Sequence, residues 1–417
     1  MTCDRVPLKF LADLNPETLT DSTDPAFSFG YIDIGSTGRG ELRGRPAQVT
    51  FSESPSRARR VLRAGDSILS TVRTYLRAAW TVPKGMDPLV ASTGFLCLRP
   101  TARVDARYLG WLVQSDVVIE EVVARSVGVS YPAISPEEVG RIEVPCPAER
   151  QQKAVADYLD QETARIDSVI AAKRRMRDLM EERFDAAVFC WTTGADCVAR
   201  NLKPTNLDWI DAIPADWSTP TVGANFQVQL GKMLNATAAT GPNQLPYLRN
   251  INVQWDRIDV RDVATMHFDA ADRRLFGLRD GDLLVCEGGE VGRAAIWHDD
   301  LTECYFQKAL HRVRPLRDAN PRYLMYCLWA AAKRGVFAVE GNLSTIVHLT
   351  REQLKAHRFP WPPPTEQARI VERLDRLRNS TTDVIGGLRR QITLLQERRS
   401  ALISTAVTGQ LDLSKAA

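Results

Sequence analysis

The sequence predicts an α+β protein with two pseudo-symmetric mixed α/β modules, separated by a pair of long antiparallel coiled-coil helices. Three observations lead to this prediction. The sequence repeats itself once, each copy mixes short strand-like and helical segments, and each copy closes with a long segment of helical periodicity. The predicted boundaries are 1–147 and 205–364 for the modules, and 148–194 and 365–410 for the long helices.

The repeat has an offset of 215 or 216 residues. Leu62–Asp66 resembles Leu278–Asp282 at the larger offset, and Arg107–Leu109 resembles Arg322–Leu324 at the smaller one. Chance similarity does not keep one register over a whole module, and the period is far too long for a solenoid. We therefore expect approximate internal two-fold symmetry.

Each copy begins with a mixed segment. A Gly-Asp turn leads into a strand-like run at 66–72 in the first copy and at 282–286 in the second. A glycine-rich stretch, Gly288–Arg293, follows the second of these runs. It resembles a phosphate-binding loop only loosely, and we favour a tight turn between two strands.

A short helix follows in each copy, after Ser135 in the first and after Thr350 in the second. Both residues are good N-caps, and Glu138 and Gln353, three residues further on, complete capping boxes. Pro136 occupies the first helical position, where its missing N–H costs nothing. A proline-rich exit then leads into the long helix.

The long helices carry apolar residues in steps of three, four or seven, as in the seam of a coiled coil. At 1.5 Å per residue each helix is a rod of roughly 60 Å. Two arrangements are possible: each helix covers only its own module, or it packs against the other helix. We favour the second, because the stripe of apolar residues along each helix is narrow and long. We expect Gly386 and Gly387 to weaken or bend the second helix, and Gly194 and Gly409 to end the two helices. The predicted seam residues are Leu159, Ile166, Val169, Met176, Met180, Phe184, Leu374, Leu377, Val384, Leu388, Ile392 and Leu395.

The composition is that of an ordinary globular protein: of 417 residues, 44% are apolar and 25% are charged. The longest apolar run, Tyr323–Ala332, has ten residues, whereas a membrane span needs about 20. The segment Met1–Arg5 lacks the features of a signal peptide. We therefore expect a cytoplasmic protein without a membrane partner. The eight cysteines form no CxxC pair and are expected to be free thiols.

Basic residues concentrate in one stretch of the first copy. Residues 43–77 hold eight arginines against Glu53 and Asp66, although the net charge of the whole chain is only +3. Such a patch is a candidate footprint for DNA phosphates. A solvated face in an arginine-rich protein is the alternative, since the chain has 44 arginines and 10 lysines.

No catalytic motif is present in the sequence. It has no P-loop, no HExxH, no GxSxG, no nuclease triad and no Asn-Pro-Pro-aromatic element. All five histidines lie in the second copy, which favours structural roles over catalysis or metal binding. We expect a binding or scaffolding protein with no metal and no cofactor in this chain.

Motifs along almost the whole chain resemble the specificity (S) subunit of type I restriction-modification systems. Each is weak alone, but their order and their duplication make them specific. The motifs are Gln151–Asp160 and Glu162–Asp167 in the first copy, and Ile213–Trp217, Pro246–Val253, Leu278–Asp282, Gly288–Arg293, Phe306–Lys308 and Pro362–Gln367 in the second. The first copy departs from the pattern, because it lacks the Ile-Pro-x-x-Trp opening and has Arg73–Arg77 in place of the glycine-rich turn.

The resemblance implies a function. Each module would be a target recognition domain that reads one half of a bipartite, asymmetric site in double-stranded DNA. The helices would set the spacing and dock two adenine methyltransferase subunits, which bind S-adenosylmethionine. Restriction subunits, the motor and nuclease, would use ATP and Mg. This chain would be non-catalytic. A stand-alone DNA-binding scaffold without restriction partners is the main alternative, and an enzyme with an unrecognised site is a further one.

The predicted DNA contacts are polar loop residues at matching places in the repeat. Arg and Lys suit guanine, and Asn and Gln suit adenine, in the major groove. Arg77 and Arg293 align with each other, so they are expected to serve the fold or the phosphates. The predicted contacts are Arg57, Arg59, Arg60, Arg73, Tyr75, Arg77, Ser130 and Tyr131 in the first module, and Lys232, Asn250, Asn252, Gln254, Glu290, Arg293, Gln307, Lys308, Asn342, Ser344 and Thr345 in the second.

Overall fold

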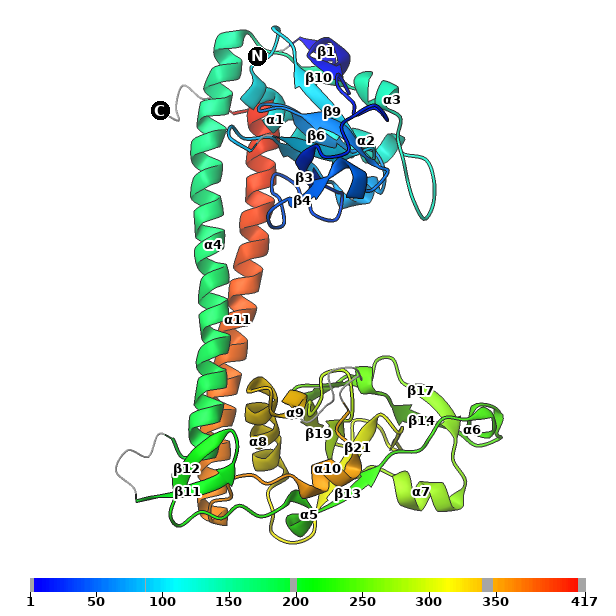
Figure 1. The fold of residues 1–417 in the computed structure, drawn as a ribbon, viewed down its shortest axis with the longest axis vertical. Helices are drawn as coiled ribbons and strands as arrows, with labels where there is room; N and C mark the ends of the chain where they lie inside the picture. The colour runs from blue at the N-terminus through cyan, green and yellow to red at the C-terminus, as the bar shows by residue number, and fades with distance from the viewer. Residues whose placement is uncertain (1–3, 87, 196–200, 340–347, 412–417) are drawn as a thin grey trace. The chain divides into compact units, whose positions relative to one another are not determined.

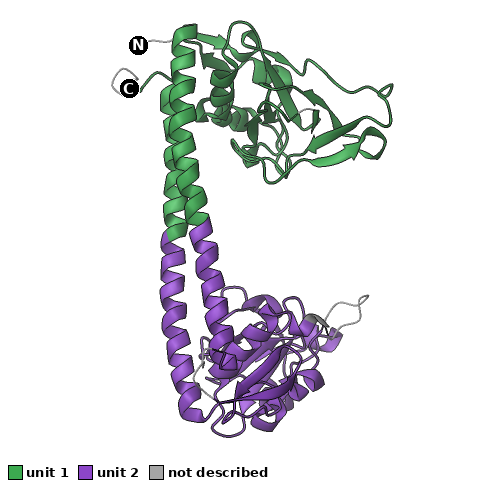
Figure 2. Cartoon of the chain, turned by 60° about the vertical axis from the view of Figure 1, so that its left-hand side comes forward, with its two compact units in different colours: residues 1–174, 388–417 green, residues 175–387 purple. Residues whose placement is uncertain are grey.

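The computed structural model describes residues 4–86, 88–195, 201–339 and 348–411. Figure 1 shows its helices and strands, and Figure 2 colours its two units. Unit 1 joins residues 1–174 with residues 388–417, and unit 2 is the continuous segment 175–387. Each unit therefore contains one globular domain and one segment from each long helix.

Unit 1 contains two four-stranded sheets. The first has the order β2 (Ala12–Leu14), β9 (Phe95–Pro100), β6 (Ser67–Ser70) and β7 (Ala79–Thr81), and is antiparallel throughout. The second has the order β4 (Ala47–Thr50), β3 (Ser28–Ile32), β8 (Leu89–Ser92) and β5 (Ala58–Leu62), with β3 and β8 parallel. The remaining elements are β1 (Arg5–Pro7), β10 (Glu143–Pro145), α1 (Ala106–Gln114), α2 (Asp116–Arg125), α3 (Pro136–Gly140) and the 3-10 turns η1 (Leu8–Phe10), η2 (Phe51–Glu53) and η3 (Thr74–Leu76).

Unit 2 repeats this arrangement. Its antiparallel sheet has the order β13 (Phe226–Leu230), β21 (Leu310–Pro315), β18 (Leu283–Cys286) and β19 (Ala294–Ile296). Its second sheet has the order β17 (Ala264–His267), β14 (Gln244–Leu248) and β20 (Tyr305–Phe306), with β14 and β20 parallel. The remaining elements are β11 (Leu202–Leu207), β12 (Ile210–Pro214), β15 (Val253–Gln254), β16 (Arg257–Ile258), α5 (Val222–Asn225), α6 (Ala236–Thr240), η4 (Asn250–Asn252), α7 (Ala270–Phe276), α8 (Pro321–Lys333), α9 (Val336–Val339) and α10 (Arg351–Ala356).

A buried ion pair recurs at the same place in both sheets. Asp66 binds Arg99 at 2.8 Å in unit 1, and Asp282 binds Arg314 at 2.6 Å in unit 2. Both carboxylates are at most 2% exposed. The Gly-Asp turns of the sequence therefore place a charge inside each domain, next to the arginine that neutralises it. This detail confirms the predicted duplication.

The loop after β6 is longer by one residue than the loop after β18. The Ser70 N–H bonds the Ala78 carbonyl, and the Cys286 N–H bonds the Arg293 carbonyl. Ala78 thus takes the place of Arg293, so the predicted alignment of Arg77 with Arg293 is wrong. The repeated Arg-Ala sequence hid the insertion, which shifts the register by one residue.

The two long helices are α4 (Glu149–Thr193) and α11 (Pro364–Val407). Gly194 and Gly409 follow them with φ of +74° and +71° and end them as predicted. The helix α11 continues through Gly386 and Gly387, so these residues do not interrupt it.

The long helices run antiparallel within each unit. In unit 1 an ion pair joins Asp167 to Arg399 at 3.0 Å, and a hydrogen bond joins Lys173 to Gln391 at 2.6 Å. Residue numbers thus rise along α4 as those of their partners in α11 fall. In unit 2 the guanidinium of Arg378 lies 5.3 Å from the Phe184 ring, and that of Arg373 lies 4.1 Å from Trp191.

Burial along these helices departs from the predicted seam at three places. Val169, Met176 and Val384 are 42%, 52% and 37% exposed, so their assignment to a buried seam is wrong. The neighbouring Ile170 and Ile385 are buried instead. A helix of 3.6 residues per turn drifts against a seven-residue repeat, which moves the stripe to the next position. The other predicted seam residues are buried (Leu159, Ile166, Phe184, Leu374, Leu388) or partly buried (Met180, Leu377, Ile392, Leu395).

Each globular domain holds the C-terminal end of one long helix through a buried tyrosine of α1 or α8. The Tyr108 hydroxyl lies 3.1 Å from the Pro145 carbonyl and 3.3 Å from the Val407 carbonyl. The Tyr323 hydroxyl lies 3.1 Å from the Thr192 carbonyl and 3.0 Å from a proline carbonyl. Helix ends leave carbonyls unsatisfied, and these hydroxyls meet that need.

The short helices α3 and α10 begin at the predicted caps. The Ser135 hydroxyl accepts from the Glu138 N–H, but the Glu138 carboxylate binds Arg141, so the first capping box is only half formed. Thr350 and Gln353 form the complete reciprocal pair. Pro136 occupies the first turn as expected.

The described cysteines are free thiols, and four of those six are buried. No helix in the described part of the chain is both long enough and apolar enough to cross a membrane.

Candidate nucleic-acid interface

The loop between β6 and β7 and the neighbouring loop 127–131 form an exposed surface on unit 1, which we call the unit 1 tip. It consists of Arg73, Tyr75, Val129, Ser130 and Tyr131. The Arg73 guanidinium lies 5.0 Å from the Tyr131 ring centroid, and Tyr75 and Tyr131 are 55% and 66% exposed. The tip thus offers a cation and two aromatic rings to a ligand, as nucleic-acid surfaces do.

The tip is held by an unusual backbone. Arg73 and Arg77, which flank η3, both adopt positive φ, at +52° and +53°. Non-glycine residues in this region cost of order 1 kcal/mol or more each. Bridges from Ala133 to Val72 and to Val127 tie the two loops together. Strained residues persist only where the surrounding structure holds them, so these bridges help to keep the loop around η3 in its conformation.

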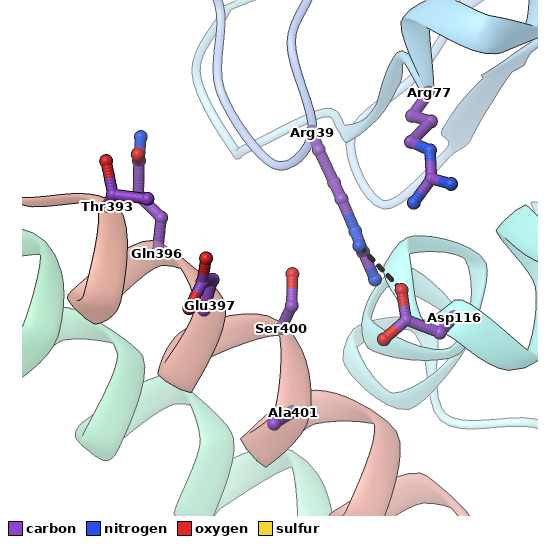
Figure 3. Close-up of a pocket in the computed structure, with 8 residues that line it drawn as sticks. All are labelled: Arg39, Arg77, Asp116, Thr393, Gln396, Glu397, Ser400 and Ala401. Atoms are coloured by element: carbon purple, nitrogen blue, oxygen red, sulfur yellow. Dashed lines mark hydrogen bonds and ion pairs between the residues drawn. The ribbon is translucent and has the colours of Figure 1, made fainter.

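Arg77 is paired with a carboxylate of unit 1. It pairs with Glu120 of α2 at 2.8 Å and lines a hollow of about 460 Å³ in unit 1 (Figure 3). Arg39 of the same hollow binds Asp116 at 2.8 Å. The carboxylates around this hollow balance its arginines, so it does not have the charge of a phosphate site.

The basic stretch of unit 1 is partly neutralised by the protein itself. Arg59 pairs with Asp21 at 3.1 Å and lies 5.1 Å from the Phe51 ring, while Arg60 donates to the Thr18 hydroxyl. Arg57 is exposed. The local charge is therefore lower than the sequence suggests.

In unit 2 the glycine-rich stretch is a tight turn between β18 and β19, as predicted. Asn250 donates to the Gly288 carbonyl at 2.7 Å, and Arg293 donates to the Asn250 side chain at 2.7 Å. Glu290 accepts from the Trp255 indole at 2.5 Å and pairs with Arg293 at 3.5 Å. The structure thus brings Asn250, Glu290 and Arg293 together, with Glu290 exposed and the Arg293 side chain only 14% exposed.

Other predicted contacts of unit 2 serve the fold. Lys232 donates to the His267 carbonyl at 2.6 Å and pairs with Asp272 at 2.5 Å, with a side chain that is 15% exposed. Asn252 is 3% exposed and donates to the carbonyls of Asp259 and Asp262.

Three further predicted residues lie near the surface of unit 2. Lys308 is exposed, and its backbone N–H donates to the Lys232 carbonyl. Gln307 is partly exposed and forms a β-bridge with Lys232. Gln254 is partly exposed and donates to the Ile251 carbonyl. Asn342, Ser344 and Thr345 lie outside the described residues.

Sequence reasoning missed the apolar part of these loops, because it searched for polar side chains. Val127 and Val129 are 80% and 102% exposed in unit 1, and Met233, Leu234 and Ile251 are 51–59% exposed in unit 2. Apolar residues in a loop without strand or helix periodicity were the signal available in the sequence. Such residues contact thymine methyl groups or wedge between bases in DNA complexes.

No group of three or more His, Cys, Asp or Glu side chains in the described ranges is placed to hold a metal ion. His311 is fully buried and bonds the Leu349 carbonyl at 2.7 Å, and this burial lowers its pKa, so the ring is neutral. Its role is structural.

Comparisons with known proteins agree with this geometry. Residues 214–394 match the family model described as the type I restriction modification DNA specificity domain. The EcoKI specificity subunit of Escherichia coli K12 is 22% identical over 341 residues, which cover 78% of this chain and 70% of that protein. The StySPI specificity subunit of Salmonella potsdam is 22% identical over 334 residues, with the same two coverages.

A solved structure from a study of complex assembly and conformational transition of the type I R-M system shares the fold. Its TM-score is 0.67 at 22% identity, over 98% of both chains. The duplicated α+β domains and the paired long helices are therefore the fold of that solved chain. Residues 214–394 thus match a type I restriction modification DNA specificity domain, and the chain is similar to proteins named as specificity subunits, in line with the resemblance of its motifs.

Proposed function

We propose that each domain reads one half of a bipartite, asymmetric DNA site. The observation that carries the proposal is a shared scaffold with unlike loops. The strand order of β2-β9-β6-β7 repeats in β13-β21-β18-β19, whereas the loop after β6 carries Arg73 and Tyr75 and the loop after β18 carries glycines. Two different surfaces on one scaffold suit two different half-sites.

The side chains of each domain suggest how it reads DNA. In unit 1, Arg73 offers the donors that recognise guanine, and Tyr75 and Tyr131 offer aromatic faces for stacking. In unit 2, Asn250 and Gln254 offer amides of the kind that recognise adenine, although Asn250 also holds the glycine turn. Arg57 and Lys308, both exposed, are suited to phosphates, which position the domain without reading sequence.

The helices α4 and α11 would set the distance between the half-sites and dock two adenine methyltransferase subunits. In this proposal the methyltransferase subunits bind S-adenosylmethionine, and the restriction subunits use ATP and Mg, in the cytoplasm where the DNA lies. Both helices expose many charged side chains along their length, for example Arg174 and Arg175 in α4, so they have surface available for partner helices.

Methylome sequencing tests the proposal. A host that expresses this chain with its neighbouring methyltransferase subunit is compared with a host that lacks the chain. We expect a split motif with modified adenines in both halves. Exchanging residues 1–145 for those of a relative should change one half only. A change in both halves, or in neither, contradicts the assignment of one half-site to each domain.

Co-purification separates this proposal from a stand-alone DNA-binding scaffold. A specificity subunit should bind the methyltransferase subunit in a stable complex, whereas a scaffold binds DNA alone. Chain-dependent methylation together with a purified complex supports the proposal, and DNA binding without any complex favours the scaffold.

A further inference from the structure

The loop between α2 and α3 forms a short projection on unit 1 (Figure 1). The Val127 N–H donates to the Ala133 carbonyl at 2.9 Å, and the Ala133 N–H donates back to the Val127 carbonyl at 3.0 Å. This exchange of two hydrogen bonds closes the loop at its base, as in an antiparallel strand pair. The five residues 128–132, Gly-Val-Ser-Tyr-Pro, therefore stand out beyond the base, and we call them the wedge loop.

The base of the wedge loop is fastened to the rest of the domain on both sides. After the loop, the Ile134 N–H donates to the Thr71 carbonyl at 2.9 Å. Before it, the Ser126 hydroxyl accepts a hydrogen bond of 2.8 Å from the Thr74 hydroxyl. A projection with a fixed base loses little conformational entropy when it meets a ligand.

An apolar side chain stands unprotected on this projection. Val129 is 102% exposed, so no other part of the domain covers it. Gly128 precedes it with φ of +117°, where a β-carbon would lie 3.2 Å from the Tyr131 carbonyl oxygen. Ser130 follows it. Since both neighbours of Val129 are small, neither obstructs the approach of its side chain to a ligand.

The charges around the wedge loop favour DNA as the ligand. Residues 126–134 contain no acidic residue. The Arg73 guanidinium lies 5.0 Å from the Tyr131 ring centroid, and it forms no ion pair within the described part of the chain. Proteins that bend DNA combine such cations with apolar side chains that enter between neighbouring base pairs.

We propose that Val129 inserts between two stacked base pairs of the half-site bound by unit 1 and opens that base step. Insertion transfers the exposed side chain from water to the apolar faces of the bases. Pyrimidine–purine steps unstack most easily, so Val129 favours such a step without a hydrogen bond to any base. The inference rests on the proposed reading of DNA and deepens it, because it assigns part of the specificity to the deformability of the DNA.

Binding to a duplex that is already opened tests the proposal. Two DNA duplexes of one sequence are compared, one fully paired and one with a bulge of unpaired adenines at its centre. The bulge has broken the stacking in advance, so a wedge enters it more easily, whereas the phosphates available for contact are nearly the same. Fluorescence anisotropy at one salt concentration measures the affinity of the full chain, and we expect tighter binding of the bulged duplex by about tenfold or more.

Variants of the full chain sharpen the test. Val129→Ser removes the apolar side chain and should abolish most of the preference for the bulged duplex. Val129→Ile keeps an apolar side chain and should retain the preference. Leu316→Ser is the matched control, since it removes a side chain of unit 2 that is 56% exposed. None of these changes alters the charge, so the salt dependence of binding should stay the same.

A preference for the bulged duplex that persists in Val129→Ser would overturn the proposal. Equal binding of the two duplexes by the unsubstituted chain would overturn it as well, although the proposed function would then still stand. Failure to bind either duplex would overturn the proposed function together with the wedge.

A protein partner for the wedge loop predicts a different result. In that case Val129→Ser would release the methyltransferase subunit from the purified complex and leave the preference between the duplexes unchanged, which would contradict the insertion into DNA. Hydrogen exchange checks that each variant is folded.

Discussion

The loop after β6 in unit 1 has arginine at both left-handed positions, whereas unit 2 has glycine at Gly289 and Gly292. The sheets beneath these loops have the same strand order and the same buried ion pair. In unit 2 glycine makes the turn without strain, and a β-carbon at Gly292 would collide with Phe337. The comparison teaches that the scaffold fixes where a loop stands, while the loop itself is free to differ.

The largest expected effect concerns the buried ion pairs. Asp282→Ala should lower the free energy of unfolding of unit 2 by about 3–5 kcal/mol, since it leaves Arg314 without its charge partner. Asp66→Ala should cost less, because Arg99 keeps Glu17 at 3.3 Å. Hydrogen exchange in denaturant measures each unit separately. The exposed Asp280→Ala is the control, and equal losses in the two units would contradict the role of Glu17.

The second prediction concerns the unit 1 tip. Arg73→Gly combined with Tyr131→Ala should weaken binding to the full DNA site by about 1–3 kcal/mol, a loss of roughly 5- to 150-fold. Glycine at 73 imitates Gly289 and keeps the backbone conformation. Titration with sites that have either half scrambled measures which half is affected. The control Arg63→Ala, in which the lost side chain is already paired with Glu17, should change little. A loss of preference in the second half-site instead would refute the assignment.

The third prediction concerns acid sensitivity, which should appear in unit 2 alone. Burial lowers the pKa of His311 in the folded state, so the unfolded chain binds the proton more readily. Stability is therefore complete above the unfolded pKa near 6.5 and is lost as the pH falls below it, by at most about 1.4 kcal/mol at pH 5.5. Unit 1 has Leu96 at this place. His311→Leu should flatten the pH dependence of hydrogen exchange in unit 2, and an unchanged slope would show that another group causes it.

The smallest expected effect concerns the tyrosines that hold the helix ends. Tyr108→Phe and Tyr323→Phe should each lower the free energy of unfolding by about 1 kcal/mol, since each removes one hydroxyl donor from buried carbonyls. Equal losses are expected, because the contacts are the same in both units. Tyr75→Phe, at an exposed position, serves as the control. A clear difference between units 1 and 2 would mean that the two joints are not equivalent.

Much of the fold was predictable because repetition and periodicity are properties of the sequence itself. The offset of the repeat identified the two domains, and the apolar steps identified α4 and α11. The face of each helix was less certain, because neighbouring apolar residues such as Val169 and Ile170 differ by one position and only packing decides between them.

The candidate site was less predictable than the fold. Lys232 and Asn252 look like DNA contacts in sequence, yet each is used by hydrogen bonds inside its domain. The unit 1 tip depends on two loops, around Arg73 and Tyr131, that are far apart in the chain. The spacing of residues in the sequence does not reveal which polar side chains form hydrogen bonds within the protein. It also does not reveal which distant loops come together.

The division of the chain into units has a consequence for its synthesis on the ribosome. Unit 2 is one continuous segment, but the core of unit 1 includes Ile403, Ala406 and Val407, which follow unit 2 in the sequence. The first domain therefore lacks part of its own interior until residues 403–407 have been synthesised, which takes roughly 12–50 s longer at the usual 5–20 residues per second. A transcript that stops between the codons of Gly387 and Ile403 would yield a complete unit 2 beside a unit 1 that lacks part of its core.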